Sequence, residues 1–284
     1  MYTKSIRDRS FPYRLTLRSQ LFVFWTLLVL MTAIPALRLF GDSWWALVVA
    51  ALVLFLLSRG TSAGSDRLFV DEHPITPNSH PELYEVVAGL ARKARLRVMP
   101  SVSILPRAVI NAAASGNSQR PRILVTTGLL QNLDRRSVRA VLAHEIAHIA
   151  HRDLDNFRFS SLLRSTAVGL SIVGLLLEGW FAGDILWMLF FVALPMLTLW
   201  VLLAISRNRE YAADLFAAEI TADPEALASA LYNIEYRQRS FWSSFLGLPA
   251  PREESLFRSH PATEERIRRL MKLAPKAQGR GVWV

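Results

Sequence analysis

The chain has 284 residues, of which 52% are hydrophobic, and it carries a formal net charge of +10. Its mean hydropathy is positive, which soluble domains of this size rarely show, and the absence of cysteine excludes disulfides and thiolate metal ligands. A positive charge of this size is suited to binding either nucleic acid or anionic lipid headgroups. Long apolar runs alternate with the basic stretches, so we interpret the chain as a membrane protein and expect no nucleic-acid partner.

The N-terminal residues 1–20 are rich in lysine and arginine and are predicted to form a basic cytoplasmic arm. Apolar runs over 21–37 and 44–58 follow, and we expect them to form a first transmembrane hairpin within residues 21–58. The second run is short for a span. No clear small-residue cleavage site follows the long basic arm, so the first run is interpreted as an uncleaved anchor.

Residues 59–164 have the character of a soluble domain and are predicted to be the first half of it. Apolar spacing predicts a helix over 77–95. Gly116-Asn117 provides a turn signal between the last two of three β-like stretches. These stretches are residues 98–105, 108–114 and 123–127.

The next predicted helix contains the motif His144-Glu145-Ile146-Ala147-His148, and Asp134 can cap its start. On a helix, His144 and His148 lie one turn apart on one face, with about 5–6 Å between their Cβ atoms. Two such imidazoles can bind one zinc ion, with Glu145 beside them as general base. A core helix with two surface histidines is the alternative.

Two further apolar runs, 165–177 and 185–206, predict a second transmembrane hairpin over residues 165–206. The basic residues concentrate in the arm, the central block and the C-terminal block, so all three are expected on the cytoplasmic side of the inner membrane. Residues 207–284 are predicted to form the second half of the soluble domain. Its expected helices are 207–220, 223–239 and 264–273.

A catalytic zinc site needs a third protein ligand. His151 lies about 10 Å along the helix from His144, which is out of reach of an ion bound by the first pair. Glu210 is a better candidate, because Asp214 follows one helical turn later on the same face. Glu210 could bind zinc while Asp214 orients a ligand histidine through its free ring N–H. A solvated charged pair at a helix start fits this spacing equally well.

These segments resemble the HtpX family of bacterial membrane zinc peptidases, which are relatives of the CAAX prenyl endopeptidases. The resemblance covers about 77–273 and includes the HExxH motif, the run from Ser206 to Asp214, and Ser259-His260-Pro261. It implies a mainly α, gluzincin-type zinc peptidase fold with a small β-sheet. The apolar runs add about four transmembrane helices in two hairpins.

The resemblance also implies the roles of individual residues. It assigns one zinc ion per chain to His144, His148 and Glu210, and it makes Glu145 the catalytic base. The residue at Asp214 is implied to orient a ligand or to donate a proton.

The stretch from Asn111 to Ala114 resembles the family's substrate-holding strand, in which phenylalanine stands where this chain has Ala113. Asn111 and Ala112 could therefore pair with the backbone of a substrate. His260 could donate a hydrogen bond to the oxyanion of the reaction, or it could be a structural histidine.

The sequence thus predicts a membrane-embedded zinc-dependent endopeptidase that hydrolyses peptide bonds of membrane or misfolded proteins at the cytoplasmic face. The quality-control role comes from the resemblance alone. The alternatives are a prenyl-protein-type processing peptidase, an inactive membrane scaffold with a structural zinc site, and a membrane-tethered nucleic-acid binder suggested only by charge.

Overall fold

The computed structural model describes residues 72–181, 185–246 and 263–274, together with residue 26. The predicted basic arm, the predicted first hairpin and His260 lie outside these residues. The described chain divides into two compact units. One contains residues 72–154, 207–246 and 263–274, and the other contains residues 155–181 and 185–206.

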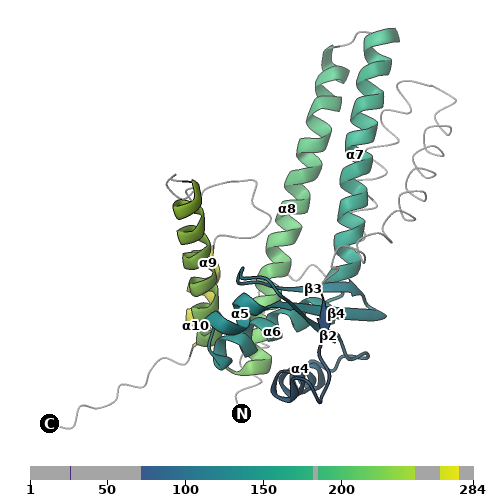
Figure 1. The fold of residues 1–284 in the computed structure, drawn as a ribbon. Coiled ribbons are helices and arrows are strands. Elements are labelled where there is room, and N and C mark those ends of the chain that lie inside the picture. The colour runs from purple at the N-terminus through teal and green to yellow at the C-terminus, as the bar shows by residue number, and fades with distance from the viewer. Residues whose placement is uncertain (1–25, 27–71, 182–184, 247–262, 275–284) are drawn as a thin grey trace. The chain divides into compact units, whose positions relative to one another are not determined.

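The first unit contains a small mixed sheet with the strand order β1-β2-β4-β3 (Figure 1). Strands β2 and β4 are parallel, whereas β1 pairs with β2 and β3 pairs with β4 in antiparallel orientation. The strands are β1 His73–Pro74, β2 Ser101–Leu105, β3 Ala112–Asn117 and β4 Arg120–Thr126. Strand β3 is therefore an edge strand of this sheet.

Strand β3 lies further along the chain than the predicted stretch 108–114, and Gly116-Asn117 belongs to the strand and not to a turn. The side chain of Asn117 accepts hydrogen bonds from the backbone N–H groups of Gln119 and Arg120, at 2.9 and 2.8 Å, which moves the turn to 118–119. Gly116 has φ +88°, and a Cβ there would lie 2.2 Å from the carbonyl oxygen of Arg120. The glycine is thus required by the end of the strand.

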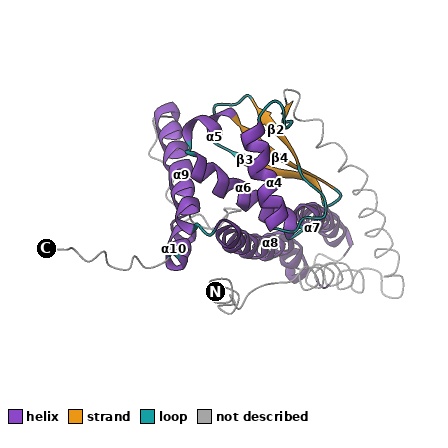
Figure 2. Cartoon of the chain, turned by 90° about the horizontal axis from the view of Figure 1, so that it is seen from below, coloured by secondary structure: helices purple, strands orange, loops and turns teal. Residues whose placement is uncertain are grey.

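In the described part of the first unit, five helices and the end of helix α8 (Ile185–Thr221) share one core with the sheet. Figure 2 shows the strands gathered beside α4, α5 and α6. The helices are α4 Pro81–Lys93, α5 Thr127–Asn132, α6 Arg135–Ala150, α9 Pro224–Leu246 and α10 Thr263–Leu273. Helix α5 was not predicted; the side chain of Thr126 caps it by accepting the N–H of Leu129.

Helix α6 is the central helix of the first unit. Asp134 caps it as predicted, accepting the N–H of Ser137 at 2.8 Å. It contacts α4, α9 and β3, and its apolar residues are buried on several faces. Because neighbours surround the helix, polar side chains in its middle turns point into the protein and not into solvent.

The second unit is formed by most of two long helices, α7 Asp153–Phe181 and α8 Ile185–Thr221. Both are longer than the predicted runs, and the expected separate helix 207–220 is the continuation of α8. No glycine or proline interrupts the chain between Pro195 and Asp223, so nothing in the sequence ends the helix earlier.

Of the residues described, α8 is the one helix long and apolar enough to cross a membrane. The prediction of about four transmembrane helices is therefore not confirmed, because the first hairpin is not described and the apolar part of α7, Leu163–Leu176, is shorter. The mainly α fold with a small sheet is confirmed.

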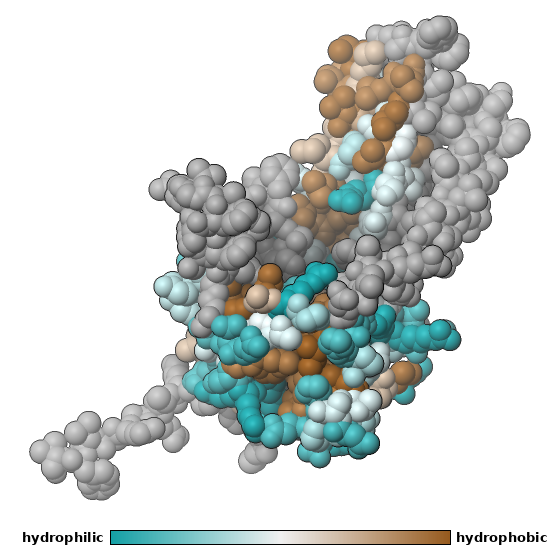
Figure 3. Space-filling view, in the orientation of Figure 1, coloured by the Kyte–Doolittle hydropathy of each residue, from teal (hydrophilic) through white to brown (hydrophobic). Residues whose placement is uncertain are grey.

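Large apolar side chains cover the exposed faces of α7 and α8 within this unit (Figure 3). The most exposed are Ile172, Leu176, Ile185, Leu186, Leu189, Val192, Leu197 and Trp200. Exposed apolar side chains in this number are costly in water and favourable in lipid.

The two helices pack closely at Gly174. The backbone oxygen of Phe191 accepts a hydrogen bond from Ser171, and the Phe191 side chain is only 1% exposed. A Cβ at position 174 would lie 2.2–2.4 Å from the Phe191 ring. The missing side chain of Gly174 therefore makes room for the aromatic ring.

We predict that Gly174→Ala lowers the thermal unfolding temperature of the detergent-purified protein, because the added methyl group must displace the Phe191 ring. Gly169→Ala is the matched control on the same helix, since a Cβ there meets no atom within 4 Å. It should leave the unfolding temperature unchanged or raise it, because alanine is the better helix former by about 0.5–1 kcal/mol. Equal effects of the two substitutions would contradict this packing.

Candidate active site

Side chains from two helices converge in the first unit. His144 and His148 project from adjacent turns of α6, and Glu210 comes from the part of α8 that belongs to this unit. One ligand atom from each of the three lies within 4.8 Å of the others. His144 and Glu210 are buried, and His148 is half-buried.

The distances between the donor atoms suit a tetrahedral zinc ion. The two Nε2 atoms are 3.1 Å apart, Nε2 of His144 is 3.5 Å from Oε2 of Glu210, and Nε2 of His148 is 3.7 Å from Oε1 of Glu210. Zinc bonds of about 2.0–2.2 Å at tetrahedral angles place donor atoms about 3.3–3.6 Å apart. Two nitrogens and a carboxylate oxygen are also a common donor set for catalytic zinc. His144, His148 and Glu210 can therefore hold this ion.

Each histidine has a carboxylate beside its other ring nitrogen. Nδ1 of His144 lies 3.0 Å from Oδ1 of Asp214, and Nδ1 of His148 lies 2.8 Å from Oδ2 of Asp153. A carboxylate at Nδ1 fixes the proton there and leaves Nε2 as the lone-pair nitrogen. Both Nε2 atoms consequently face the same point.

Sequence reasoning missed Asp153. It follows His148 by five residues, so on a continuous helix it would lie more than one turn away and to one side. Instead α6 ends at Ala150, and Arg152 adopts φ 61°, a left-handed conformation that turns the chain so that Asp153 lies back over His148. The carboxylate is buried, with 8% of the residue exposed. No glycine, asparagine or proline lies between His148 and Asp153, so no helix-breaking residue signals this helix end.

Arg266 of α10 was also missed, because nothing in the local sequence links it to a residue 52 positions earlier. Its guanidinium forms a two-pronged ion pair with Asp214, with Nε 2.8 Å from Oδ2 and Nη2 2.7 Å from Oδ1. Nη1 lies 3.4 Å from a carboxylate oxygen of Glu210. Burial by itself lowers the pKa of Arg266, but the charges of Asp214 and Glu210 outweigh burial and raise the pKa, so the guanidinium stays charged.

The same charges act on His144. Burial by itself lowers its pKa, but the interactions with Asp214 and Glu210 outweigh burial and raise the pKa to about 10, while the charge of Arg266 opposes the rise. A metal-binding imidazole must be neutral, so protons compete with a metal ion at this residue and metal affinity falls as the pH falls.

The carboxylate of Glu145 reaches the edge of the sheet. Its Oε2 accepts a hydrogen bond from the backbone N–H of Ala114, at 2.7 Å. The backbone oxygen of Asn111 accepts the N–H of Thr126 on β4 at 3.1 Å, so the backbone groups of Ala112 and Ala114 alternate to the opposite, open side. Glu145 therefore lies beside the edge of β3 to which no other described strand pairs.

The sequence contains two other candidate histidines, His151 and His260. His151 ends α6, and its ring packs against that of Phe216, with 5.2 Å between centroids. It is not part of the described cluster. His260 lies outside the described residues.

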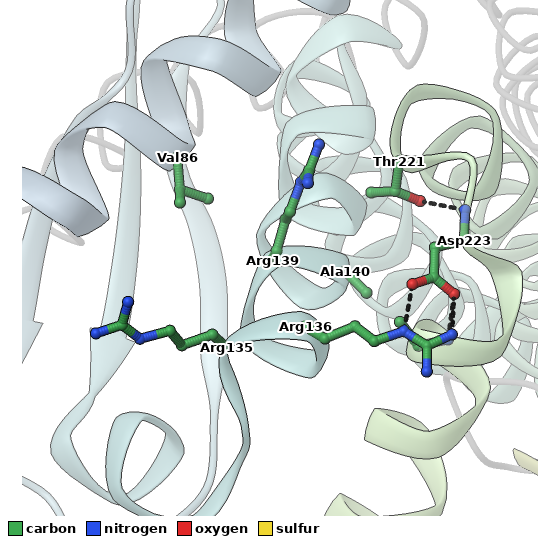
Figure 4. Close-up of a pocket in the computed structure, with 8 residues that line it drawn as sticks. Val86, Arg135, Arg136, Arg139, Ala140, Thr221 and Asp223 are labelled. Carbon is green, nitrogen blue, oxygen red and sulfur yellow. Dashed lines mark hydrogen bonds and ion pairs between the residues drawn. The ribbon is translucent and has the colours of Figure 1, made fainter.

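A surface pocket lies elsewhere in this unit, beside α4, α6 and the start of α9 (Figure 4). None of the residues of the donor cluster lines it. There the side chain of Arg136 donates two hydrogen bonds to Asp223, which also accepts the N–H of Ala226 at 3.1 Å and caps α9. This contact joins the starts of α6 and α9, so we assign it a structural role.

The fold and the site define a metalloprotease class, in which a helix supplies two histidines and a glutamate base and a second helix supplies an acidic ligand. Comparison with known proteins agrees. The model of peptidase family M48 matches residues 77–274, so the chain belongs to peptidase family M48.

Relatives in this family carry the description protease HtpX homolog. The protein of Salinibacter ruber is 36% identical over 216 residues, which cover 70% of this chain and 76% of the relative. That of Campylobacter concisus is 32% identical over 253 residues, which cover 78% and 87%. The predicted resemblance to HtpX peptidases is confirmed, and the chain is a membrane metalloprotease.

The crystal structure of S. mikatae Ste24p has a similar fold, with a TM-score of 0.52 at 20% identity. The match covers 88% of this chain but only 62% of the Ste24p chain. At this identity the likeness concerns the fold alone.

We predict that Asp153→Asn weakens zinc binding about 10- to 100-fold, because the amide holds the His148 tautomer less firmly than the carboxylate does. Zinc affinity of the purified protein, measured by chelator competition, tests this. Glu82→Gln is the control, since that carboxylate lies on the surface and pairs with Arg135 at 2.8 Å. Wild-type affinity in Asp153→Asn would exclude the orienting role.

Proposed function

We propose that the protein is a zinc-dependent endopeptidase of the inner membrane that hydrolyses peptide bonds of membrane or misfolded proteins at the cytoplasmic face. The observation that carries the proposal is the placement of Glu145 between a zinc-type donor set and an unpaired strand edge. Metal, base and peptide can meet at this one point.

In this proposal His144, His148 and Glu210 would hold one zinc ion, which would supply Lewis-acid chemistry for peptide hydrolysis. Glu145 takes the proton of a water molecule and transfers it to the leaving amine. The hydrogen bond from Ala114 keeps one carboxylate oxygen of Glu145 fixed while the other is available for the proton.

Asp214 and Asp153 are proposed to orient the two ligand histidines. Both carboxylate oxygens of Asp214 are already engaged by Arg266, and one of them also faces His144. This arrangement supports orientation and not proton donation by Asp214. His260 remains a candidate hydrogen-bond donor to the oxyanion.

The substrate is proposed to bind as an added strand on β3. The backbone groups of Ala112 lie on the open edge, and the side chains of Asn111 and Ala113 are exposed. Pairing through main-chain hydrogen bonds depends little on the side chains of the substrate. Such a site accepts many unfolded segments, which fits the quality-control role implied by the resemblance to HtpX peptidases.

Mass spectrometry of peptides cut by the purified protein, with and without a chelator, tests the activity. Cleavage within chains that zinc restores after chelation supports the proposal. If the substrates stay uncleaved while zinc is bound, the result favours the alternative of an inactive scaffold with a structural zinc site.

We predict that two glutamine substitutions separate the base from the ligand. Glu145→Gln should retain wild-type zinc content while cleavage falls about 100- to 10,000-fold, because only the base is lost. Glu210→Gln keeps the shape but removes the ligand charge, so it should lose both zinc and cleavage. Glu219→Gln is the control, since it lies on the same helix outside the described cluster. Full zinc occupancy and normal turnover in Glu210→Gln would show that another residue is the third ligand.

We predict that reporter fusions after residues 64, 155 and 284 all report the cytoplasm. The prediction follows from the distribution of arginine and lysine around the apolar runs. A periplasmic signal at any of the three points would overturn the orientation.

A further inference from the structure

Helix α10 contributes one residue to the interior of the metal site. Arg266 is 7% exposed, and within the described chain it is the one buried lysine or arginine. Its guanidinium lies beside Asp214 and Glu210, which occupy the same face of α8 one turn apart. Two carboxylates so placed repel each other, and the guanidinium between them offsets that repulsion.

Burying an arginine is favourable only where its hydrogen-bonding geometry is good, because desolvation of the charge costs several kcal/mol. Here the planar fork donates from Nε and Nη2 to the two oxygens of Asp214. This arrangement leaves the carboxylate with a single orientation, in which Oδ1 also faces Nδ1 of His144. A lysine could supply the same charge but not the fork.

The rest of α10 supports this arginine. Leu270, one turn later, is 1% exposed and belongs to the main core. Arg269 places its guanidinium 3.8 Å from the ring centroid of Tyr211, the neighbour of Glu210. Two arginines of α10 therefore contact the same short stretch of α8.

We infer that Arg266 is a positioning residue of the metal site: it holds the Asp214 carboxylate against His144 and thereby sets the orientation of a zinc ligand from a helix that carries no ligand itself. The inference rests on the proposed zinc site. It makes metal affinity and the docking of α10 interdependent, because each stabilises the arrangement that the other requires.

Charge and geometry must be separated in the test, since Nη2 of Arg266 is also 3.4 Å from Nε2 of His144 and its charge repels a bound cation. Arg266→Lys keeps the charge and removes the fork. We expect it to weaken zinc binding about 10- to 100-fold in chelator competition on the full-length purified protein. Arg268→Lys, an exposed arginine of the same helix, is the control and should bind zinc as the wild type does.

A double-mutant cycle with Asp214→Asn tests the route of action. If Arg266 acts through Asp214, adding Arg266→Lys to Asp214→Asn should lower zinc affinity by no more than about 2-fold further, because the interaction is already lost. Independent, multiplying losses would overturn the inference. Wild-type affinity in Arg266→Lys would overturn it as well.

A variant that lacks this one buried ion pair covers the case in which Arg266→Lys does not fold. In Arg266→Met/Asp214→Leu both partners become apolar, which proteins often tolerate without loss of stability. The expected result is a folded protein, judged by its thermal transition without zinc, with weakened zinc binding. Wild-type zinc affinity would show that the Arg266–Asp214 pair stabilises the fold without affecting the zinc ligands. If the wild type itself bound no zinc, the proposed function would fail, whereas the preceding outcomes concern Arg266 alone.

Discussion

The metal site depends on the compensation of buried charge. Six ionisable side chains are buried in the described residues, and all of them lie in or beside one cluster. They are His144, Glu145, Asp153, Glu210, Asp214 and Arg266. With neutral histidine, four carboxylates and one guanidinium leave a net charge of −3, and a divalent ion reduces it to −1. Uncompensated buried charge is strongly unfavourable, so this cluster favours a bound cation.

The raised pKa of His144 reflects the same excess of negative charge, because a proton on the imidazole is the alternative compensation. The fold maintains the excess by enclosing α6 with α4, α9 and the sheet. Water that would screen the carboxylates is thereby excluded, while the hydrogen bond from Ala114 joins the buried Glu145 carboxylate to edge strand β3. The excess of buried negative charge and the neighbouring strand edge together make this cluster the candidate active site.

The sequence predicted those parts of the site that depend on local spacing. His144 and His148 share a face because four residues make about one helical turn, and the same rule paired Glu210 with Asp214. The pairing of Asp153 with His148 was not predicted because Arg152, which adopts a left-handed conformation, interrupts the helical spacing. Arg266 was missed because its partner is remote in the chain, and only tertiary packing of α10 brings the two together.

The fold was predictable to a similar degree. The helices around the motif and the small sheet follow from apolar periodicity, but the register of β3 depends on hydrogen bonds of the Asn117 side chain that composition does not reveal. The continuity of α8 was missed because a change from apolar to charged residues was interpreted as a boundary. Hydropathy marks the change of environment, and such a change does not by itself end a helix.

X-ray absorption spectroscopy at the zinc edge of the purified protein tests the central claim most directly. The account predicts one zinc per chain with two imidazole nitrogens and oxygen ligands at about 2.0–2.2 Å, the oxygens being those of Glu210 and water. Scattering from three imidazoles would contradict it, since another histidine would then replace Glu210. A site without imidazole scattering would contradict the assignment of His144 and His148 altogether.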